Sequence, residues 1–226
     1  MTGKFKNYMN KLFKVLNCGI RLIVLLSVSY SWTAEFNLNS GKNLFLFIGL
    51  PCSGKTTACR KIAENNKNMV HQSVGDLLRL EAQEITPRGK LTKSLLDQGK
   101  LIPFEITLKI LEDFFLENQK SVILLDGYQG TKDYIEPFHN LILRHDIRLV
   151  KVLSFDVSIP IALERSRARM RADDTPAAFS SRLEIRLKNI NDIQEYYDTQ
   201  HLLIHIDGQA SLDQVISRAE HIILNQ

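Results

Sequence analysis

Residues 49–56 read Gly49-Leu50-Pro51-Cys52-Ser53-Gly54-Lys55-Thr56, which fits the pattern G-x-x-x-x-G-K-[ST]. The apolar run Leu44–Ile48 precedes this stretch and the helical pattern Thr56–Glu64 follows it, so the flanks are those of a phosphate-binding loop (P-loop) between a strand and a helix. The glycines let the backbone wrap phosphates with its N–H groups and the helix N-terminus. Lys55 adds a cation for the β- and γ-phosphates, and the hydroxyl of Thr56 or Thr57 can bind Mg²⁺, directly or through water. The stretch predicts binding of ATP or GTP.

Short apolar runs alternate with helix-length segments from residue 43 onward. The candidate strands are Leu44–Ile48, Met69–Gln72, Ser121–Leu125, Leu149–Phe155 and Leu202–Ile206. Alternating strands and helices predict an α/β fold, in which a parallel sheet carries helices on both faces. Two late helices have clear start signals: Thr175 with Pro176, and Ser211 with Gln214.

Composition and charge narrow the class of protein. The 226 residues are 44% hydrophobic and 24% charged, which suits a globular domain with an extension. The net charge of +4 lies entirely in residues 1–40, and residues 41–226 are balanced, so we expect no nucleic-acid surface. Three cysteines, Cys18, Cys52 and Cys59, form neither a disulfide framework nor a paired zinc pattern, which indicates a reducing compartment.

The N-terminal segment leaves the location of the protein open. Leu22–Ala34 is apolar, follows several lysines, and is shorter than the about 20 residues of a membrane span. It resembles a secretory signal, particularly if translation starts at Met9, and it also suits an amphipathic or disordered extension. We therefore treat residues 1–40 as an extension and residues 41–226 as the domain. Contact with a membrane or the export machinery through residues 1–34 stands beside a cytoplasmic location.

Asp126 ends the apolar run Val122–Leu125, where a carboxylate that orders Mg²⁺ would stand. A helix cap or turn is the alternative role for this residue. A P-loop alone does not name a reaction, because GTPases, ATPases and small-molecule kinases share it.

Three further segments resemble those of adenylate kinases and the related UMP/CMP kinases. They are Gly75-Asp76-Leu77-Leu78-Arg79, Gln98-Gly99-Lys100-Leu101-Ile102-Pro103, and Arg171-Ala172-Asp173-Asp174-Thr175 before a helix that contains Ser181-Arg182-Leu183. The resemblance covers about residues 43–226. It implies a five-stranded parallel sheet, a short lid, and in-line transfer of the γ-phosphoryl group of Mg-ATP to a nucleoside monophosphate. AMP is the family's default acceptor, and a cytoplasmic monomer is the expected form.

The resemblance also assigns site residues. The ATP-binding set is Gly49, Pro51, Cys52, Ser53, Gly54, Lys55, Thr56 and Thr57, and the acceptor-binding set is Gly75, Arg79, Lys100, Ile102, Gly127, Gly130 and Tyr134. The implied catalytic residues are Lys55, Asp126, Arg165, Arg171 and Arg182, with Thr56 and Asp126 serving Mg²⁺. Guanidinium groups suit the spread negative charge of a phosphoryl group in transfer. With no cysteine after Cys59, the zinc-bearing long lid of some relatives is excluded.

The departures from the family pattern gather on the acceptor side. The family's Asp-Gly-Phe/Tyr-Pro-Arg reads Asp126-Gly127-Tyr128-Gln129-Gly130 here, so an arginine that would grip the acceptor phosphate is absent. Tyr134 replaces a glutamine that reads adenine, and Val74 replaces a threonine. On the donor side Cys52 and Thr56 replace glycines. A P-loop kinase with another acceptor, and a nucleotide-binding module with weak or no catalysis, therefore remain alternatives.

Overall fold

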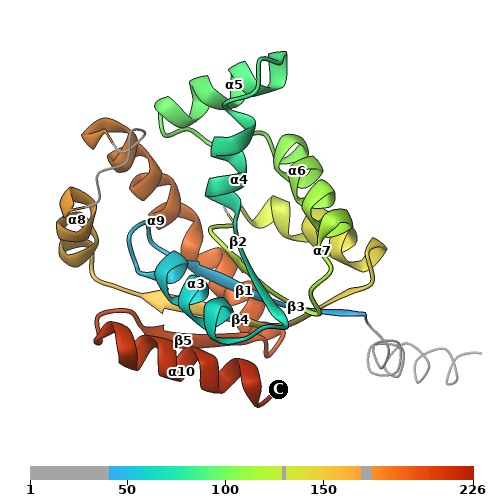
Figure 1. Cartoon of the computed structure of the whole chain (residues 1–226). Helices are drawn as coiled ribbons and strands as arrows, with labels where there is room; N and C mark the ends of the chain where they lie inside the picture. The colour runs from blue at the N-terminus through green and yellow to red at the C-terminus, as the bar shows by residue number, and fades with distance from the viewer. Residues whose placement is uncertain (1–40, 129–130, 169–174) are drawn as a thin grey trace, which may run out of the picture. The chain divides into compact units, whose positions relative to one another are not determined.

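A five-stranded, wholly parallel sheet forms the centre of the domain (Figure 1). The computed structural model describes residues 41–128, 131–168 and 175–226. The strands, in the spatial order β2-β3-β1-β4-β5, are β1 (Lys42–Gly49), β2 (Met69–Ser73), β3 (Val122–Asp126), β4 (Ile147–Asp156) and β5 (Leu203–Asp207). All five apolar runs are therefore strands, and the predicted parallel α/β fold is confirmed.

Helices connect the strands. They are α3 (Lys55–Asn65), α4 (Val74–Glu81), α5 (Pro87–Asp97), α6 (Phe104–Glu117), the short 3₁₀ helix η1 (Lys132–Tyr134), α7 (Ile135–Arg144), α8 (Ile159–Ala168), α9 (Pro176–Thr199) and α10 (Leu212–Leu224). The predicted start signals hold: the Thr175 hydroxyl accepts a hydrogen bond from the Ala178 N–H, and Ser211 with Gln214 forms a capping box.

Alternation along β1 divides the core into two layers. Leu44, Leu46 and Ile48 point to the face that α6, α7 and α9 cover. Phe45 and Phe47 point to the opposite face, against α3 and α10. Because successive strand residues face opposite sides, a central strand buried on both sides reads as one apolar run. Helices on both faces are thus a consequence of the pattern that β1 carries.

The strand register brings the carboxyl ends of three strands together. Ser73 at the end of β2 and Phe47 near the end of β1 both pair with Asp126 at the end of β3. The loop after β1 therefore begins beside Asp126. Ligands of open parallel sheets bind outside these carboxyl ends.

The loop after β1 has a backbone that side chains rarely adopt. Gly49 and Gly54 have φ of 138° and 98°, and a Cβ on Gly49 would lie 2.5 Å from the Phe155 carbonyl oxygen. Cys52, which stands where the family has a glycine, also has a positive φ of 62°. A left-handed residue with a Cβ costs about 1–2 kcal/mol. The Cys52 side chain packs against the hydrophobic cluster of Leu50, Phe179 and Leu183.

Every described residue belongs to one compact unit, Gly41–Gln226. Residues 1–40, with the predicted contact to a membrane or the export machinery, lie outside the described part of the chain. Among the helices of the described part, none combines the length and apolar character that crossing a bilayer demands.

We predict that residues 1–34 are dispensable for folding and catalysis, because the sheet and its loops are built from residue 41 onward. A chain that begins at Asn39 should be soluble, melt within a few degrees of the full chain, and turn over at the same rate. Thermal unfolding and a coupled ADP assay on both chains test this. Loss of folding in the shortened chain would mean that the N-terminal segment packs into the domain.

Candidate active site

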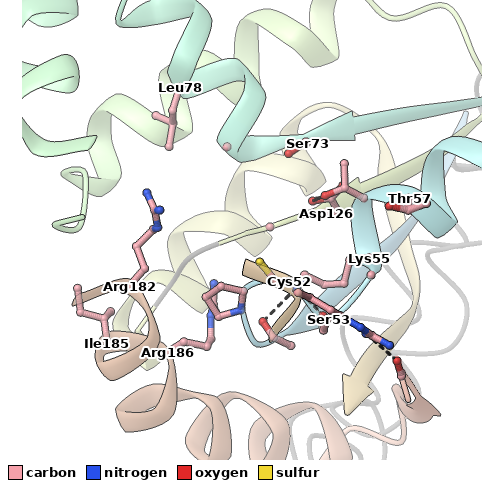
Figure 2. Close-up of a pocket in the computed structure, with 18 of the residues that line it drawn as sticks. Cys52, Ser53, Lys55, Thr57, Ser73, Leu78, Asp126, Arg182, Ile185 and Arg186 are labelled. Atoms are coloured by element: carbon pink, nitrogen blue, oxygen red, sulfur yellow. Dashed lines mark hydrogen bonds between the residues drawn. The ribbon is translucent and has the colours of Figure 1, made fainter. Parts of the chain in front are cut away.

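A cleft of about 580 Å³ lies at the carboxyl ends of the strands (Figure 2). It brings together most of the residues that the sequence singled out. They are Gly49, Pro51, Cys52, Ser53, Gly54, Lys55, Thr56, Thr57, Gly75, Arg79, Lys100, Ile102, Asp126, Gly127, Arg165 and Arg182. Arg171 and Gly130 lie outside the described residues.

The P-loop ends directly in a helix. Gly54 precedes the first residue of α3, Lys55, and no side chain caps this helix start. The first-turn N–H groups of a helix have no partner within the helix and carry its positive dipole end. They therefore suit the phosphates of a nucleotide.

Lys55 is a buried cation, only 8% exposed. Its ammonium donates hydrogen bonds to the Gly49 carbonyl (3.2 Å), the Leu50 carbonyl (2.8 Å) and the Ser53 hydroxyl (2.9 Å). Burial lowers the pKa of Lys55 to about 8; the Asp126 carboxylate opposes this shift and the positive charge of Arg186 adds to it. The lysine is thus held on the loop in an environment that an anion would stabilise.

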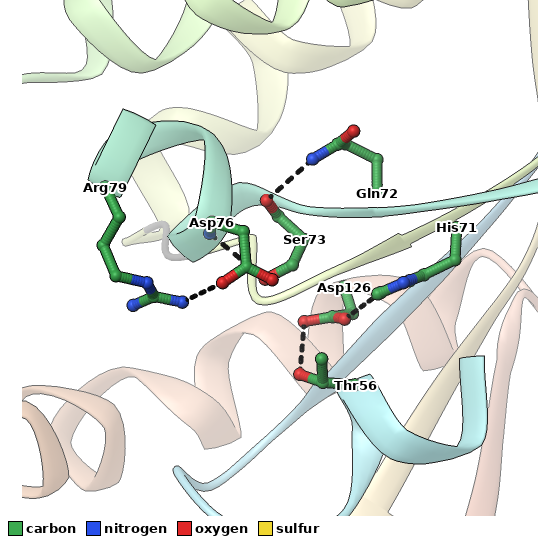
Figure 3. A network of polar contacts seen from close by, with 7 residues as sticks. All are labelled: Thr56, His71, Gln72, Ser73, Asp76, Arg79 and Asp126. Carbon is green, nitrogen blue, oxygen red and sulfur yellow. Dashed lines mark hydrogen bonds and ion pairs between the residues drawn. The ribbon is translucent and has the colours of Figure 1, made fainter. Parts of the chain in front are cut away.

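The Asp126 carboxylate is oriented from both sides (Figure 3). The Thr56 hydroxyl donates to its Oδ1 at 3.2 Å, and His71 Nε2 lies 2.5 Å from its Oδ2. Asp126 is 2% exposed, and these two contacts orient both of its carboxylate oxygens. Thr56 and Asp126 together offer the oxygen ligands that Mg²⁺ prefers.

A second possible metal-binding group is a poor fit. Cys59, His71 and Asp126 have ligand atoms within 4.8 Å of one another. Cys59 is fully buried, and burial raises the pKa of its thiol, so the sulfur stays protonated. The short His71–Asp126 contact also leaves no space for an ion between the two ligand atoms. The donor set favours Mg²⁺ at the oxygens of Thr56 and Asp126 over a metal at this group.

The part of the cleft where the sequence places the acceptor is built by α4 and the loop between α5 and α6. Ser73 caps α4 by accepting from the Asp76 N–H at 3.4 Å, and Arg79 forms an ion pair with Asp76. Lys100 and Ile102 come from the α5–α6 loop, whose Gly99 carbonyl accepts from the Ser181 hydroxyl of α9 at 3.2 Å. These contacts fix two chain segments around the space next to Arg79.

Two replaced positions lie away from the cleft surface. Val74 is buried in the hydrophobic core and is not among the lining residues. Tyr134 also does not line the cleft: its ring packs against Phe104 with the ring centres 5.2 Å apart, and its carbonyl accepts from the Tyr128 hydroxyl at 2.6 Å. Neither side chain is therefore positioned at the cleft in this structure.

Arginines approach the cleft from α8 and α9. Arg165 donates from Nη1 to the Gly208 carbonyl at 2.9 Å, which ties α8 to the loop after β5. Arg182 and Arg186 both project from α9, one helical turn apart (Figure 2). The sequence motifs indicated Arg182 and not Arg186.

The cleft contains further residues that the motifs did not indicate as site residues. They are Arg60, Ser73, Leu78, Leu96, Gly99, Leu101, Ile185, Arg186, Gly208, Ala210, Leu212 and Val215. The spacing of four residues between Arg182 and Arg186 was a usable signal, because such residues share one helix face. The sequence signal for His71 was weaker: it lies two residues before Ser73, on a strand that pairs with β3.

Comparison with known proteins gives the family. The family model described as adenylate kinase matches residues 47–202. Adenylate kinases of Nautilia profundicola and Nitratiruptor sp. are each 36% identical to this chain, over 80% and 82% of it and 96% and 97% of their own lengths. That of Helicobacter pylori is 35% identical over 81% of this chain and 98% of its own.

These matches confirm the resemblance found in the motifs, and a module without catalysis is not favoured. The chain therefore belongs to the adenylate kinase family and is an ATP-dependent phosphotransferase of the nucleoside-monophosphate kinase type.

Proposed function

We propose that the P-loop side of the cleft binds Mg-ATP, that Arg79 holds the phosphate of a nucleoside monophosphate, and that the γ-phosphoryl group passes in line between them. An oxygen of the acceptor phosphate attacks the γ-phosphorus, the bond to the β,γ-bridging oxygen breaks, and ADP leaves. The observation that carries this proposal is that Lys55 and Arg79 line one cleft. By family default the acceptor is AMP.

On the donor side, residues Gly49–Thr57 surround the triphosphate with backbone N–H groups, and Lys55 neutralises the β- and γ-phosphates. Mg²⁺, when bound, would spread the negative charge of these phosphates. Thr56 and Asp126 would hold it, partly through water, and the contact of Asp126 with His71 keeps the carboxylate in one orientation.

The arginines that would act on the transferring group come from the lid side. Arg165 and Arg182 line the cleft, and Arg171 joins them by the family pattern. Guanidinium groups neutralise charge that develops in transfer, and closure over the site would keep water from the phosphoryl group.

The acceptor side supports weak discrimination between bases. Arg79, Gly75, Gly127, Lys100 and Ile102 remain for the acceptor, while the sequence lacks the family's arginine at Gly130. Selectivity depends on polar groups that go unpaired with the wrong ligand. Because the adenine-reading glutamine and the threonine are also replaced, by Tyr134 and Val74, we infer a raised KM for AMP and a flattened base preference.

We further propose that the protein acts as a monomer in the cytoplasm, because an exported kinase would meet little ATP. This rests on family membership rather than on the residues of the cleft.

The depressed pKa of Lys55 predicts that ATP affinity falls as the pH rises through about 8. Above that pH the unliganded lysine is neutral, and phosphates favour its charged form, so ATP binding takes up a proton. Calorimetric titration in two buffers of different ionisation heat measures this uptake. Lys55→Met, which keeps the length of the side chain, should abolish the uptake and lower turnover about a hundredfold or more. Undiminished turnover in Lys55→Met would contradict the donor site.

The acceptor-side changes predict that AMP has a high KM and little advantage over CMP, UMP or dAMP. Gly130→Arg introduces the guanidinium that this chain lacks at the position, and it should lower the KM for AMP about tenfold or more. Steady-state kcat/KM for the four acceptors in both proteins tests this. Gly130→Lys is the matched control, because it adds the charge without bidentate geometry and should recover less. Efficient, AMP-selective turnover by the unmodified chain would mean that other residues read the acceptor.

A further inference from the structure

Arg186 is a buried guanidinium with few partners. Its side chain is 8% exposed, and it lines the cleft from α9. Its one hydrogen bond in the described structure runs from Nη2 to the Tyr128 carbonyl, at 3.2 Å. Within the described residues no carboxylate forms an ion pair with it. Among the described residues, four of its five N–H donors have no partner and can serve a ligand in the cleft.

The charge of Arg186 is felt by the P-loop lysine. Burial lowers the pKa of Arg186 to about 10, and no carboxylate among the described residues offsets this. Its positive charge in turn lowers the pKa of Lys55, so the two cations repel each other across the cleft. Burying an unpaired charge is costly unless something compensates it. Asp126 offsets part of this for Lys55, and an anion bound in the cleft that both residues line would compensate both cations.

The position of Arg186 matches a gap in the sequence. The family's arginine is absent at Gly130, at the end of the segment that follows β3. Arg186, on helix α9, contacts this same segment at the Tyr128 carbonyl. A cation lost from the loop is therefore matched by one that reaches the loop from a helix.

We propose that Arg186 is a further catalytic residue, whose guanidinium donates hydrogen bonds to the oxygens of the phosphoryl group during transfer. This rests on the proposed function. The guanidinium gives up no proton: it stabilises charge while the bond to the acceptor oxygen forms and the bond to the β,γ-bridging oxygen breaks. Because Arg186 lies near Lys55 and acts on the transferring group, it sustains kcat, while the missing arginine at Gly130 still raises the KM for the acceptor.

Arg186→Met removes the charge and keeps most of the side-chain length. We expect kcat to fall about a hundredfold or more and the KM for ATP to rise by a smaller factor, because the guanidinium also meets the phosphates of the bound nucleotide. The unfolding temperature of the ligand-free protein should not fall, because an unpaired buried charge is removed. Lys188→Met is the matched control: it removes an exposed cation from the same helix, outside the cleft, and should leave every parameter unchanged.

A structural role predicts the opposite pattern. If Arg186 only braces α9 against Tyr128, Arg186→Met lowers the unfolding temperature and leaves kcat within about twofold, and the proposal is overturned. If the methionine variant does not fold, Arg186→Lys decides between the two roles. A guanidinium that binds the phosphoryl group through two donors predicts a kcat at least about tenfold lower than that of the unmodified protein, and an unchanged kcat would reject the proposal.

Failure of the proposed function has its own signature. If the unmodified protein transfers no phosphoryl group from ATP to any monophosphate, that function is wrong. The role of Arg186 is then tested by titrating the same variants with inorganic tripolyphosphate and measuring the shift in unfolding temperature. A smaller shift in Arg186→Met than in Lys188→Met supports a phosphoryl-binding role, and equal shifts overturn it.

Discussion

The burial of positive charge in one cleft is the constraint on which the site depends. Lys55 and Arg186 are each 8% exposed, and Asp126 is a buried carboxylate that interacts with Lys55. Such an arrangement is unfavourable in the empty protein and becomes favourable when an anion enters. Backbone carbonyls of the P-loop hold Lys55, the Tyr128 carbonyl holds Arg186, and the contact with His71 orients Asp126.

The register of the parallel sheet brings together the loops that carry the charged residues of the cleft. Because Ser73 and Phe47 both pair with Asp126, the loops after β1, β2 and β3 all leave the sheet at the carboxyl ends of the strands, close to one another. The loop after β1 carries the proposed donor site, and the segment after β2 continues into α4 with Arg79. Helix α9 spans the remaining side and brings two arginines toward the same space. Phosphates bound near Lys55 and near Arg79 would therefore face the same cleft.

Sequence patterns predicted the parts of this structure that local chemistry dictates. The P-loop, the five strands and the caps at Thr175 and Ser211 each have a signal within a few residues. The contacts of His71 and Arg186 depend on strand register and on helix orientation, which no local motif encodes. The packing of Tyr134 on Phe104 joins residues from separate elements, so the motif that indicated Tyr134 could not indicate where its ring lies.

The most direct test is an experimental structure with a bisubstrate analogue, in which a polyphosphate chain joins two adenosines. The account predicts that the Lys55 ammonium leaves the Gly49 and Leu50 carbonyls for phosphate oxygens, and that the Arg186 guanidinium lies within hydrogen-bonding distance of the phosphate between donor and acceptor. A bound polyphosphate that touches neither group, with both cations still held only by backbone carbonyls, would contradict it.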